Sequence, residues 1–265
     1  MEYTGKFYDN WDKRRYDIAA VETTHLVGEE AFGFHWLPGE PWGVAHPRAA
    51  CYADSSACIV ESQRMRMGIR LKQATFEGRH YNWAVGKVYC TETLKYGTLE
   101  VVFRLPVGRH LLPAIWMYDI NNWPPEIDLM EGYTATGWWP YNRRPLYTCR
   151  PWMNHINPGL HFGTADQEEG IGGGLNGRGT WRHIIDPHST NRCRLEWTPE
   201  MIEVRYNGHP VMRVTDGEVL RHYNECNGMH IIINNYVTDR FSYDDYTSLL
   251  RHDLEIFDIS YRRLQ

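Results

Sequence analysis

The chain has 265 residues, of which 42% are hydrophobic, 23% charged and 14% aromatic, and its formal net charge is −5. This apolar content excludes a disordered chain, and the negative charge argues against a protein that binds nucleic acid. No window approaches the run of roughly 20 apolar residues that crosses a bilayer, and the first residues lack the apolar region of a signal peptide.

Two strands are predicted in the first half of the chain. Residues 97–106 (GTLEVVFRLP) alternate apolar with polar side chains, which is the pattern of a strand with one face on a core. Residues 123–132 (WPPEIDLMEG) place three acids among residues that prefer a core. Glu126 and Asp128 alternate with Ile127, so they share one face of a strand.

Glu131 breaks that alternation, because it stands five positions after Glu126. In a regular strand it would point to the opposite side of the sheet. One inserted residue, a β-bulge near Met130, would return it to the acidic face, and bulges are frequent beside active sites. The sequence therefore predicts a bulge here.

The remaining elements follow in the second half. Residues 134–142 (TATGWWPYN) and the glycine-rich residues 172–177 predict loops, and acids precede the latter, so it is not a phosphate site. Residues 201–214 predict a hairpin, since Asn207-Gly208 is the pair preferred in a type I′ turn. Residues 231–233 and 254–261 predict two more strands. Many short strands without repeats or linkers indicate one all-β domain, residues 1–265, built as an antiparallel sandwich or barrel.

Three acids on one face are a candidate catalytic group. A retaining glycosidase needs two carboxyl groups about 5 to 5.5 Å apart, and an inverting one needs a wider gap. Because neighbouring carboxylates repel, at least one should hold a proton at neutral pH. We expect Asp128 to share a proton with Glu126, and Glu131 to have a raised pKa. The alternative is a solvated strand face whose acids have no catalytic role.

These residues carry a resemblance. The segment EIDLME at 126–131 resembles the E-x-D-x-x-E signature of glycoside hydrolase family 16, in its bulged branch of laminarinases, agarases, porphyranases and carrageenases. The flanking segments YGTLE at 96–100, LPAIWM at 112–117, EWTP at 196–199 and YNG at 206–208 are also similar to the family, in order. The likeness runs from about Gly86 to the C-terminus.

The resemblance implies a β-jelly-roll of two curved antiparallel sheets with a concave substrate cleft. It also implies that Glu126 is the nucleophile, Asp128 its assisting neighbour and Glu131 the acid/base. The activity expected is that of an endo-acting retaining β-glycoside hydrolase that cleaves internal β-1,3 or β-1,4 linkages of a polysaccharide. A β-glucan and a galactan such as agar, porphyran or carrageenan both stay open as substrates.

Aromatic residues are candidates for sugar stacking, since the chain has 11 Trp and 17 Tyr. The family positions point to Trp116 and Trp123 beside the cleaved bond, although either can equally be core material. In the adjacent pair Trp138 and Trp139, at least one side chain must leave the core of a regular strand.

Four polar residues complete the candidate site. His161 matches the family's H-x-G, where a neutral imidazole would bond the acids or the substrate. Lys87 stands where many relatives have Arg, and the resemblance suggests a contact with a sugar hydroxyl there. Arg143, in the loop after the acidic strand, could receive a sulfate or carboxylate. Asp258 resembles the position of a structural calcium ligand, although the residues after it depart from the family pattern.

The expected chemistry requires no cofactor, and a structural calcium ion stays possible. Six cysteines without a C-x-x-C pair make a zinc site improbable and leave disulfides open. We expect a monomer that binds a polysaccharide or oligosaccharide, without nucleic-acid or membrane partners. We also expect a secreted or periplasmic protein whose signal peptide is absent from this sequence; a cytoplasmic location stays open. A carbohydrate-binding protein without activity and a transglycosylase on the same fold are the rival functions.

Overall fold

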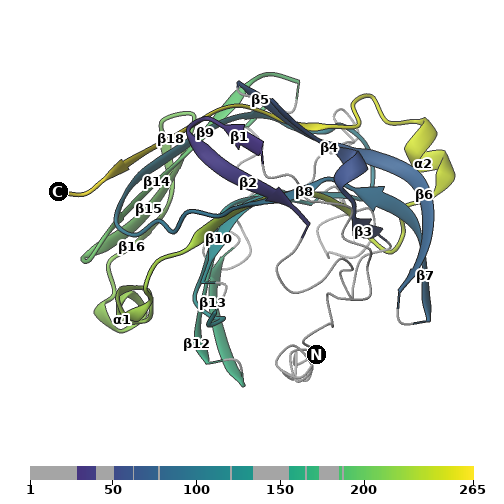
Figure 1. Ribbon diagram of the computed structural model, residues 1–265. Helices are drawn as coiled ribbons and strands as arrows, with labels where there is room; N and C mark the ends of the chain where they lie inside the picture. Colours follow the sequence, from purple (N-terminus) through teal and green to yellow (C-terminus); the bar gives the residue numbers. More distant parts are fainter. Residues whose placement is uncertain are drawn as a thin grey trace, which may run out of the picture.

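The computed structural model describes residues 29–39, 51–61, 63–76, 78–119, 121–133, 155–164, 166–172, 185–186 and 188–265. In these ranges two large antiparallel sheets stack as curved layers (Figure 1). The sandwich expected from the sequence is confirmed. That residues 1–265 form a single domain stays a prediction.

The first sheet carries the acidic strand. Among the described residues it has eight strands, in the order β1 (Glu29–Ala31), β2 (Phe34–Pro38), β8 (Lys87–Cys90), β17 (His230–Val237), β10 (Leu111–Tyr118), β11 (Glu126–Tyr133), β12 (His155–Thr164) and β13 (Gln167–Gly172). The predicted strand at 231–233 lies in its middle, as β17. Ile231, Ile232 and Ile233 are fully buried, as their continuous apolar run predicts.

The second sheet covers the inner face of the first. Its seven strands in the described ranges follow the order β16 (His209–Val214), β15 (Met201–Tyr206), β14 (Asn191–Thr198), β9 (Gly97–Arg104), β18 (Leu254–Arg263), β5 (Arg64–Met67) and β4 (Cys58–Glu61). The predicted strands at 97–106 and 254–261 correspond to β9 and β18. The predicted hairpin is β15–β16, and Asn207 and Gly208 both have positive φ, 48° and 87°, as a type I′ turn requires.

The core lies between the two sheets. In β9, Leu99, Val101 and Phe103 are at most 1% exposed, and they pack with Ile127 and Leu129 of the acidic strand. Strand β9 thus gives one face to the core and leaves its other face partly open, whereas β17 is buried on both faces. The face of the eight-stranded sheet that is turned away from the core carries the three acids, and it is called the acid face below.

A small sheet and the helical segments were not predicted. Three further strands, β3 (Cys51–Ala53), β7 (Arg79–Val85) and β6 (Ile69–Phe76), form a small sheet in which β3 and β7 run parallel. Helix α1 (Gly217–Glu225) packs beside β12 and begins at Asp216, whose carboxylate caps its first turn. Two shorter helical segments are η2 (Ser55–Ala57) and α2 (Tyr243–Thr247). Figure 1 shows β6–β7 and β12–β13 extending to the same side of the sandwich.

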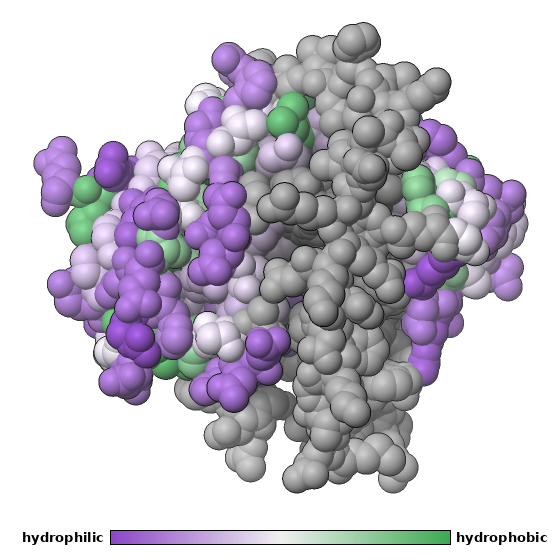
Figure 2. Space-filling model, turned by 60° about the horizontal axis from the view of Figure 1, so that its bottom comes forward, coloured by the Kyte–Doolittle hydropathy of each residue, from purple (hydrophilic) through white to green (hydrophobic). Residues whose placement is uncertain are grey.

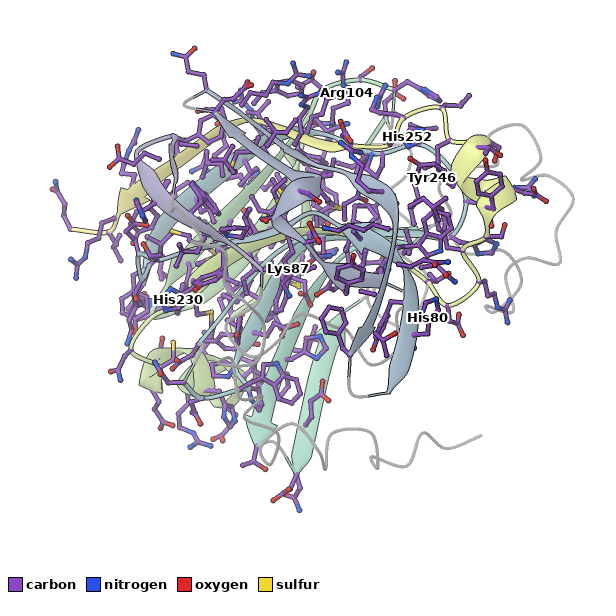
Figure 3. All side chains as sticks on the ribbon, turned by 45° about the vertical axis from the view of Figure 1, so that its right-hand side comes forward. His80, Lys87, Arg104, His230, Tyr246 and His252 are labelled. Carbon is purple, nitrogen blue, oxygen red and sulfur yellow. The ribbon has the colours of Figure 1, made fainter. Side chains whose placement is uncertain are left out.

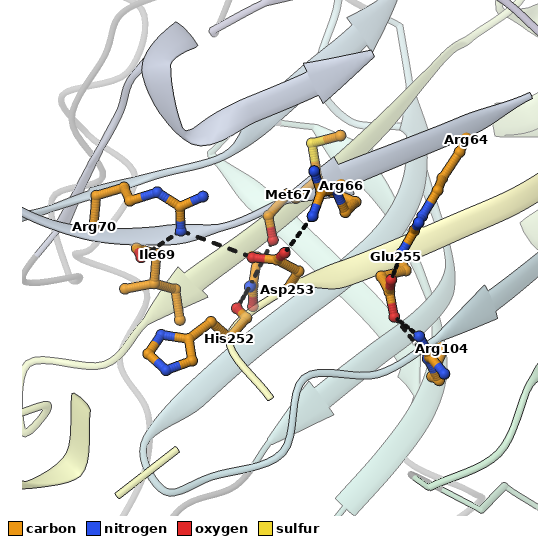
Figure 4. A network of polar contacts seen from close by, with 10 residues as sticks. Arg64, Arg66, Met67, Ile69, Arg70, Arg104, His252, Asp253 and Glu255 are labelled. Atoms are coloured by element: carbon orange, nitrogen blue, oxygen red, sulfur yellow. Dashed lines mark hydrogen bonds and ion pairs between the residues drawn. The ribbon is translucent and has the colours of Figure 1, made fainter. Parts of the chain in front are cut away.

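Away from the acids, polar contacts join the two layers at Asn235 and link three strands of the seven-stranded sheet at Glu255. The amide of Asn235, fully buried in β17, donates to the carbonyls of Met67 and His252, both at 2.9 Å. Nearby, Glu255 pairs with Arg64 and Arg104 (Figure 4). Although burial alone would raise the pKa of Glu255, the two guanidinium groups hold that pKa below its ordinary value.

The five described cysteines are free, so no disulfide joins them. No helix in the described ranges is long and apolar enough to span a membrane. Figure 2 shows the underside of the molecule, where the described residues at its flanks carry hydrophilic side chains with small, separate hydrophobic spots.

Candidate active site

The predicted bulge lies in β11, and it places all three acids on one face. Opposite β11, strand β10 pairs Tyr118 with Glu126, Trp116 with Asp128, and Ala114 with Glu131. These three β10 residues are two positions apart, so their side chains share a face, and residues directly opposite each other in a ladder do too. The bulge prediction is therefore confirmed.

Leu129 and Met130 form the bulge. Ile115 of β10 pairs with Met130 and the next residue pairs with Asp128, so Leu129 is the extra residue. Both Leu129 and Met130 are fully buried in the core between the sheets. Their burial fixes the phase of the strand on either side, because slipping by one residue would bring acids into the core.

Two buried tyrosines donate hydrogen bonds to main-chain carbonyls of the acidic strand. Tyr206 reaches across the core from β15 and donates its hydroxyl to the carbonyl of Leu129 at 2.9 Å. Tyr223 of helix α1 shares its hydroxyl hydrogen between the carbonyls of Glu126 at 3.1 Å and His161 at 2.8 Å. The bulge carbonyl and the start of the strand are thereby held by groups outside the sheet ladder.

Glu126 lies at the start of the acidic strand, and its carboxylate is mostly buried. Its carboxylate accepts a hydrogen bond of 2.8 Å from Nε1 of Trp123, and its side chain is 16% exposed. Burial, and then the charge of Asp128, raise the pKa of Glu126 well above its ordinary value, against the opposing effects of His161 and Trp123. This agrees with the expectation that one acid of the group holds a proton readily. The raised pKa expected for Glu131 stays a prediction.

Asp128 lies in the centre of the group and is 2% exposed. Gly159 of β12 stands directly opposite it in the ladder. A Cβ atom on Gly159 would lie 2.7 Å from Oδ2 of Asp128, closer than real Cβ contacts allow. The glycine is therefore needed for Asp128 to hold its present position.

His161 joins the acids from the neighbouring strand. It pairs with Glu126 across the β11–β12 ladder, and its Nε2 lies 3.2 Å from Asp128 Oδ2 and 3.8 Å from Glu126 Oε1. Its Nδ1 contacts Oε1 of Glu168 on β13. Burial lowers the pKa of His161, but the hydrogen bonds of Asp128 and Glu168 and the acid charges outweigh it and raise that pKa to about 12.

The charge of His161 corrects the sequence analysis. A neutral imidazole was expected there, but carboxylates face both ring nitrogens and raise the pKa of the ring, which favours the imidazolium. The neutral form carries a hydrogen on only one nitrogen, so it cannot donate to both partners. The sequence could not reveal this, because Glu168 reaches His161 only through the β12–β13 pairing.

A metal ion has one candidate group among the described side chains. Glu126, Asp128 and His161 offer ligand atoms that all lie within 4.8 Å of one another. To bind there, a metal ion would have to displace a proton from His161, whose pKa the neighbouring carboxylates raise. Asp258 is exposed on β18 and is not in this group, and calcium at Asp258 stays a prediction.

Aromatic side chains adjoin the acids. Trp116 stands opposite Asp128 on the acid face, is stacked on Tyr118 with ring centroids 5.3 Å apart, and donates through Nε1 to Asn234 at 2.7 Å. Trp123 is partly exposed, and its ring centroid lies 6.4 Å from that of His161. Both tryptophans thus lie beside the acids, as expected from the sequence.

Lys87 does not fit the direct contact with a sugar hydroxyl expected of it. The residue is 1% exposed, and Figure 3 labels it near the centre of the view. The ammonium donates to the hydroxyl of Tyr236 at 3.0 Å and lies 5.1 Å from the ring centroid of Trp116. Lys87 therefore orders aromatic side chains next to the site. Lysine is rarely this buried, and the sequence carried no sign of it.

Three further candidates, Trp138, Trp139 and Arg143, lie outside the described residues.

Sequence analysis also missed Glu168, Tyr118 and Asn234. A hairpin pattern in residues 155–172 would have placed Glu168 near His161. Glycines at 159, 163 and 170 interrupt the alternation of this segment, so the pattern is not visible in the sequence. Tyr118 and Asn234 come close to the acids only through the register of β10 with its neighbouring strands, which no local sequence pattern specifies.

Comparisons with known proteins agree with this geometry. No family model matches the chain. A β-glucanase of Rhodothermus marinus is 29% identical over 206 residues, which are 66% of this chain and 60% of that protein. The chain thus spans about three-fifths of the length of that relative.

Solved structures share the fold. A non-specific endo-β-1,3(4)-glucanase of glycoside hydrolase family 16 superposes with a TM-score of 0.62 at 18% identity, over 86% of this chain and 84% of the other. Porphyranase B of Zobellia galactanivorans gives 0.62 at 11% identity, over 86% and 85%. The jelly-roll fold implied by the resemblance to family 16 is therefore confirmed.

Proposed function

We propose that the chain is an endo-acting retaining β-glycoside hydrolase that cleaves internal β-1,3 or β-1,4 linkages of a polysaccharide. The observation that supports this most is the bulge in β11, which brings Glu126, Asp128 and Glu131 onto one face. A solvated strand face would not need a buried Asp128 or an imidazolium beside it. The β-glucanase relative supports the same class of reaction.

In the proposed reaction Glu126 attacks the anomeric carbon while Glu131 donates a proton to the departing glycosidic oxygen. The covalent glycosyl-enzyme forms as the carbon–oxygen bond to the leaving sugar breaks. Glu131, now a carboxylate, takes a proton from water, which attacks the same carbon and frees Glu126. The chemistry uses carboxyl groups alone, so we propose that no cofactor is required.

Asp128 and His161 set the charge around the nucleophile. Glu126 must be ionised to attack, yet its burial and Asp128 both oppose ionisation. The imidazolium of His161, 3.8 Å away, supplies the compensating positive charge. The hydrogen bond from Trp123 also favours the carboxylate. Asp128 in turn keeps His161 protonated, which is how we interpret its assisting role.

Substrate contacts are proposed at the aromatic positions. Trp116 and Trp123 adjoin the acids and are placed to stack on sugar rings. Trp138 or Trp139, and Arg143 for an anionic substituent, stay proposals from the sequence. A β-glucan and a galactan are both retained as substrate classes. We further propose a monomer that is secreted or periplasmic.

A polysaccharide panel tests the proposal. Laminarin, mixed-linkage glucan, agarose, porphyran, carrageenan and mucin glycans would be scored by new reducing ends and product size. We expect one polymer to yield oligosaccharides early, as endo cleavage does, and excess acceptor oligosaccharide would expose transglycosylation as longer products. Binding without any new reducing ends would favour the carbohydrate-binding alternative.

Glu126→Gln then tests the nucleophile. Because the amide cannot form the glycosyl-enzyme, we expect turnover to fall by about 1000-fold or more, with circular dichroism unchanged. Glu61→Gln, at an exposed position of β4, is the matched control and should keep full turnover. Wild-type turnover in Glu126→Gln would contradict the proposed role.

A further inference from the structure

The proposed reaction leaves one acid beside the site without a role. Glu168 lies on β13, where it pairs with Gly163. Gly163 and His161 are two positions apart on β12, so Glu168 and His161 share a face of the hairpin. Gly170, directly opposite His161, places no side chain between them. Oε1 of Glu168 contacts Nδ1 of His161, and the carboxylate is 18% exposed.

The other edge of the His161 ring faces the catalytic acids. Nε2 lies 3.2 Å from Asp128 Oδ2 and 3.8 Å from Glu126 Oε1. The imidazole therefore bridges the edge hairpin and the acidic strand. Within the described chain, the charged groups that contact it are Glu126 and Asp128 from β11 and Glu168 from β13. The neighbouring ring of Trp123 carries no charge.

We propose that Glu168 is a positioning residue for the glycosidase reaction. It holds the His161 ring with Nε2 toward the acids and keeps both ring nitrogens protonated, so that a positive charge stays beside the nucleophile. The inference rests on the proposed function, because the nucleophile is defined there. It assigns to Glu168 an effect that passes through His161, without contact with the sugar.

The charge of His161 matters to Glu126 at working pH. His161 lowers the pKa of Glu126, whereas burial, Asp128 and Glu131 raise it. Without Glu168 the imidazole loses the partner of Nδ1 and gives up its proton more easily. A neutral His161 would leave Glu126 among two other acids without a cation. Where His161 loses its proton before Glu126 does, Glu126 stays protonated to higher pH, and the enzyme loses activity first on the acid side.

Glu168→Gln tests this, with Glu169→Gln as the matched control. Glu169 is the next residue of the same strand, is exposed, and pairs with Phe162 on the opposite face. Both variants lose one negative charge at the same edge of the sheet. The readouts are the pH profile of kcat/KM on the polymer that the panel identifies, and the ring ¹⁵N resonances of His161 in histidine-labelled protein, assigned by their loss in His161→Asn.

We expect the acid limb of kcat/KM to move up by about one pH unit in Glu168→Gln, with a loss of about tenfold on that limb and little change on the alkaline side. His161 should lose its second ring proton at a lower pH in Glu168→Gln than in the wild type and in Glu169→Gln, which should titrate alike. If Glu168→Gln does not fold, Glu168→Asp should show the same shifts in smaller size.

An unchanged acid limb together with a His161 titration that matches the wild type in Glu168→Gln would overturn the inference. Equal shifts in Glu169→Gln would also overturn it, since they would reflect surface charge alone. If the wild type cleaves no polymer, the proposed function fails, and this outcome is separate because the ¹⁵N resonances report on Glu168 and His161 without any substrate.

Discussion

Glu126 combines burial with a neighbouring carboxylate, and both oppose its charge. This is the arrangement expected of a catalytic group, because the ionised form of a reactive carboxyl group is less stabilised by its surroundings than that of a surface one. The sequence indicated which residues form the cluster from their spacing alone. It could not indicate the charge balance, since His161 and Glu168 come from a hairpin whose pairing is a tertiary feature.

The raised pKa of Glu126 predicts a cost in stability. A group whose folded-state pKa exceeds its unfolded value contributes most to stability below the unfolded pKa, and the contribution is lost as pH rises through the folded pKa. Glu126→Gln cannot ionise, so its folded state does not lose this stability as the pH rises. We therefore expect the variant to melt at about the same temperature as the wild type near pH 4, and at least about 2 °C higher at pH 8.

Thermal melts across that pH range check the prediction. Glu61→Gln, exposed on β4, is the control and should follow the wild type at every pH. A Glu126→Gln variant that is less stable than the wild type at pH 8 would show that the carboxylate is net stabilising there, contrary to its raised pKa.

At the scale of elements, strand β11 was the most predictable part of the site. Its acids alternate with core residues, and the one mismatch in spacing was enough to predict an extra residue. The supports of the bulge were not predictable. Tyr206 and Tyr223 look like ordinary core residues in the sequence, and only the stacking of β15 and α1 on the sheet brings their hydroxyl groups to β11.

Tyr206→Phe tests how strongly the bulge depends on this support. The change leaves the buried carbonyl of Leu129 without the hydroxyl that bonds it at 2.9 Å, which costs about 1–3 kcal/mol of stability. Because the bulge sets the direction of Glu131, we expect turnover to fall by about tenfold or more as well. The measurements are the melting temperature and kcat on the identified polymer.

Tyr261→Phe provides the matched control. Its hydroxyl also bonds main-chain carbonyls, those of Lys95 and Tyr96 at 2.8 Å, but these precede β9 and do not belong to the acidic strand. It should lose stability without losing turnover. If both variants kept wild-type turnover, the bulge would not need Tyr206 to direct Glu131.

At the scale of the whole molecule, the sequence predicted the sandwich because most strands bury one face and alternate accordingly. It did not predict the small β3–β7–β6 sheet. Residues 69–76 are mostly exposed or half-buried, so their apolar residues mark no core face. Helix α1 was missed because its buried side chains, Leu220 and Tyr223, are too few to give a clear helical period.

The central claim is that the bulged strand makes Glu126 the residue that bonds to the sugar. The direct measurement uses an activated 2-deoxy-2-fluoro oligosaccharide of the cleaved polymer, which slows breakdown of a glycosyl-enzyme, followed by mass spectrometry of the peptides. We predict one adduct, carried by Glu126 and absent from Glu126→Gln. An adduct on another residue, or products released with inverted anomeric configuration, would contradict this account.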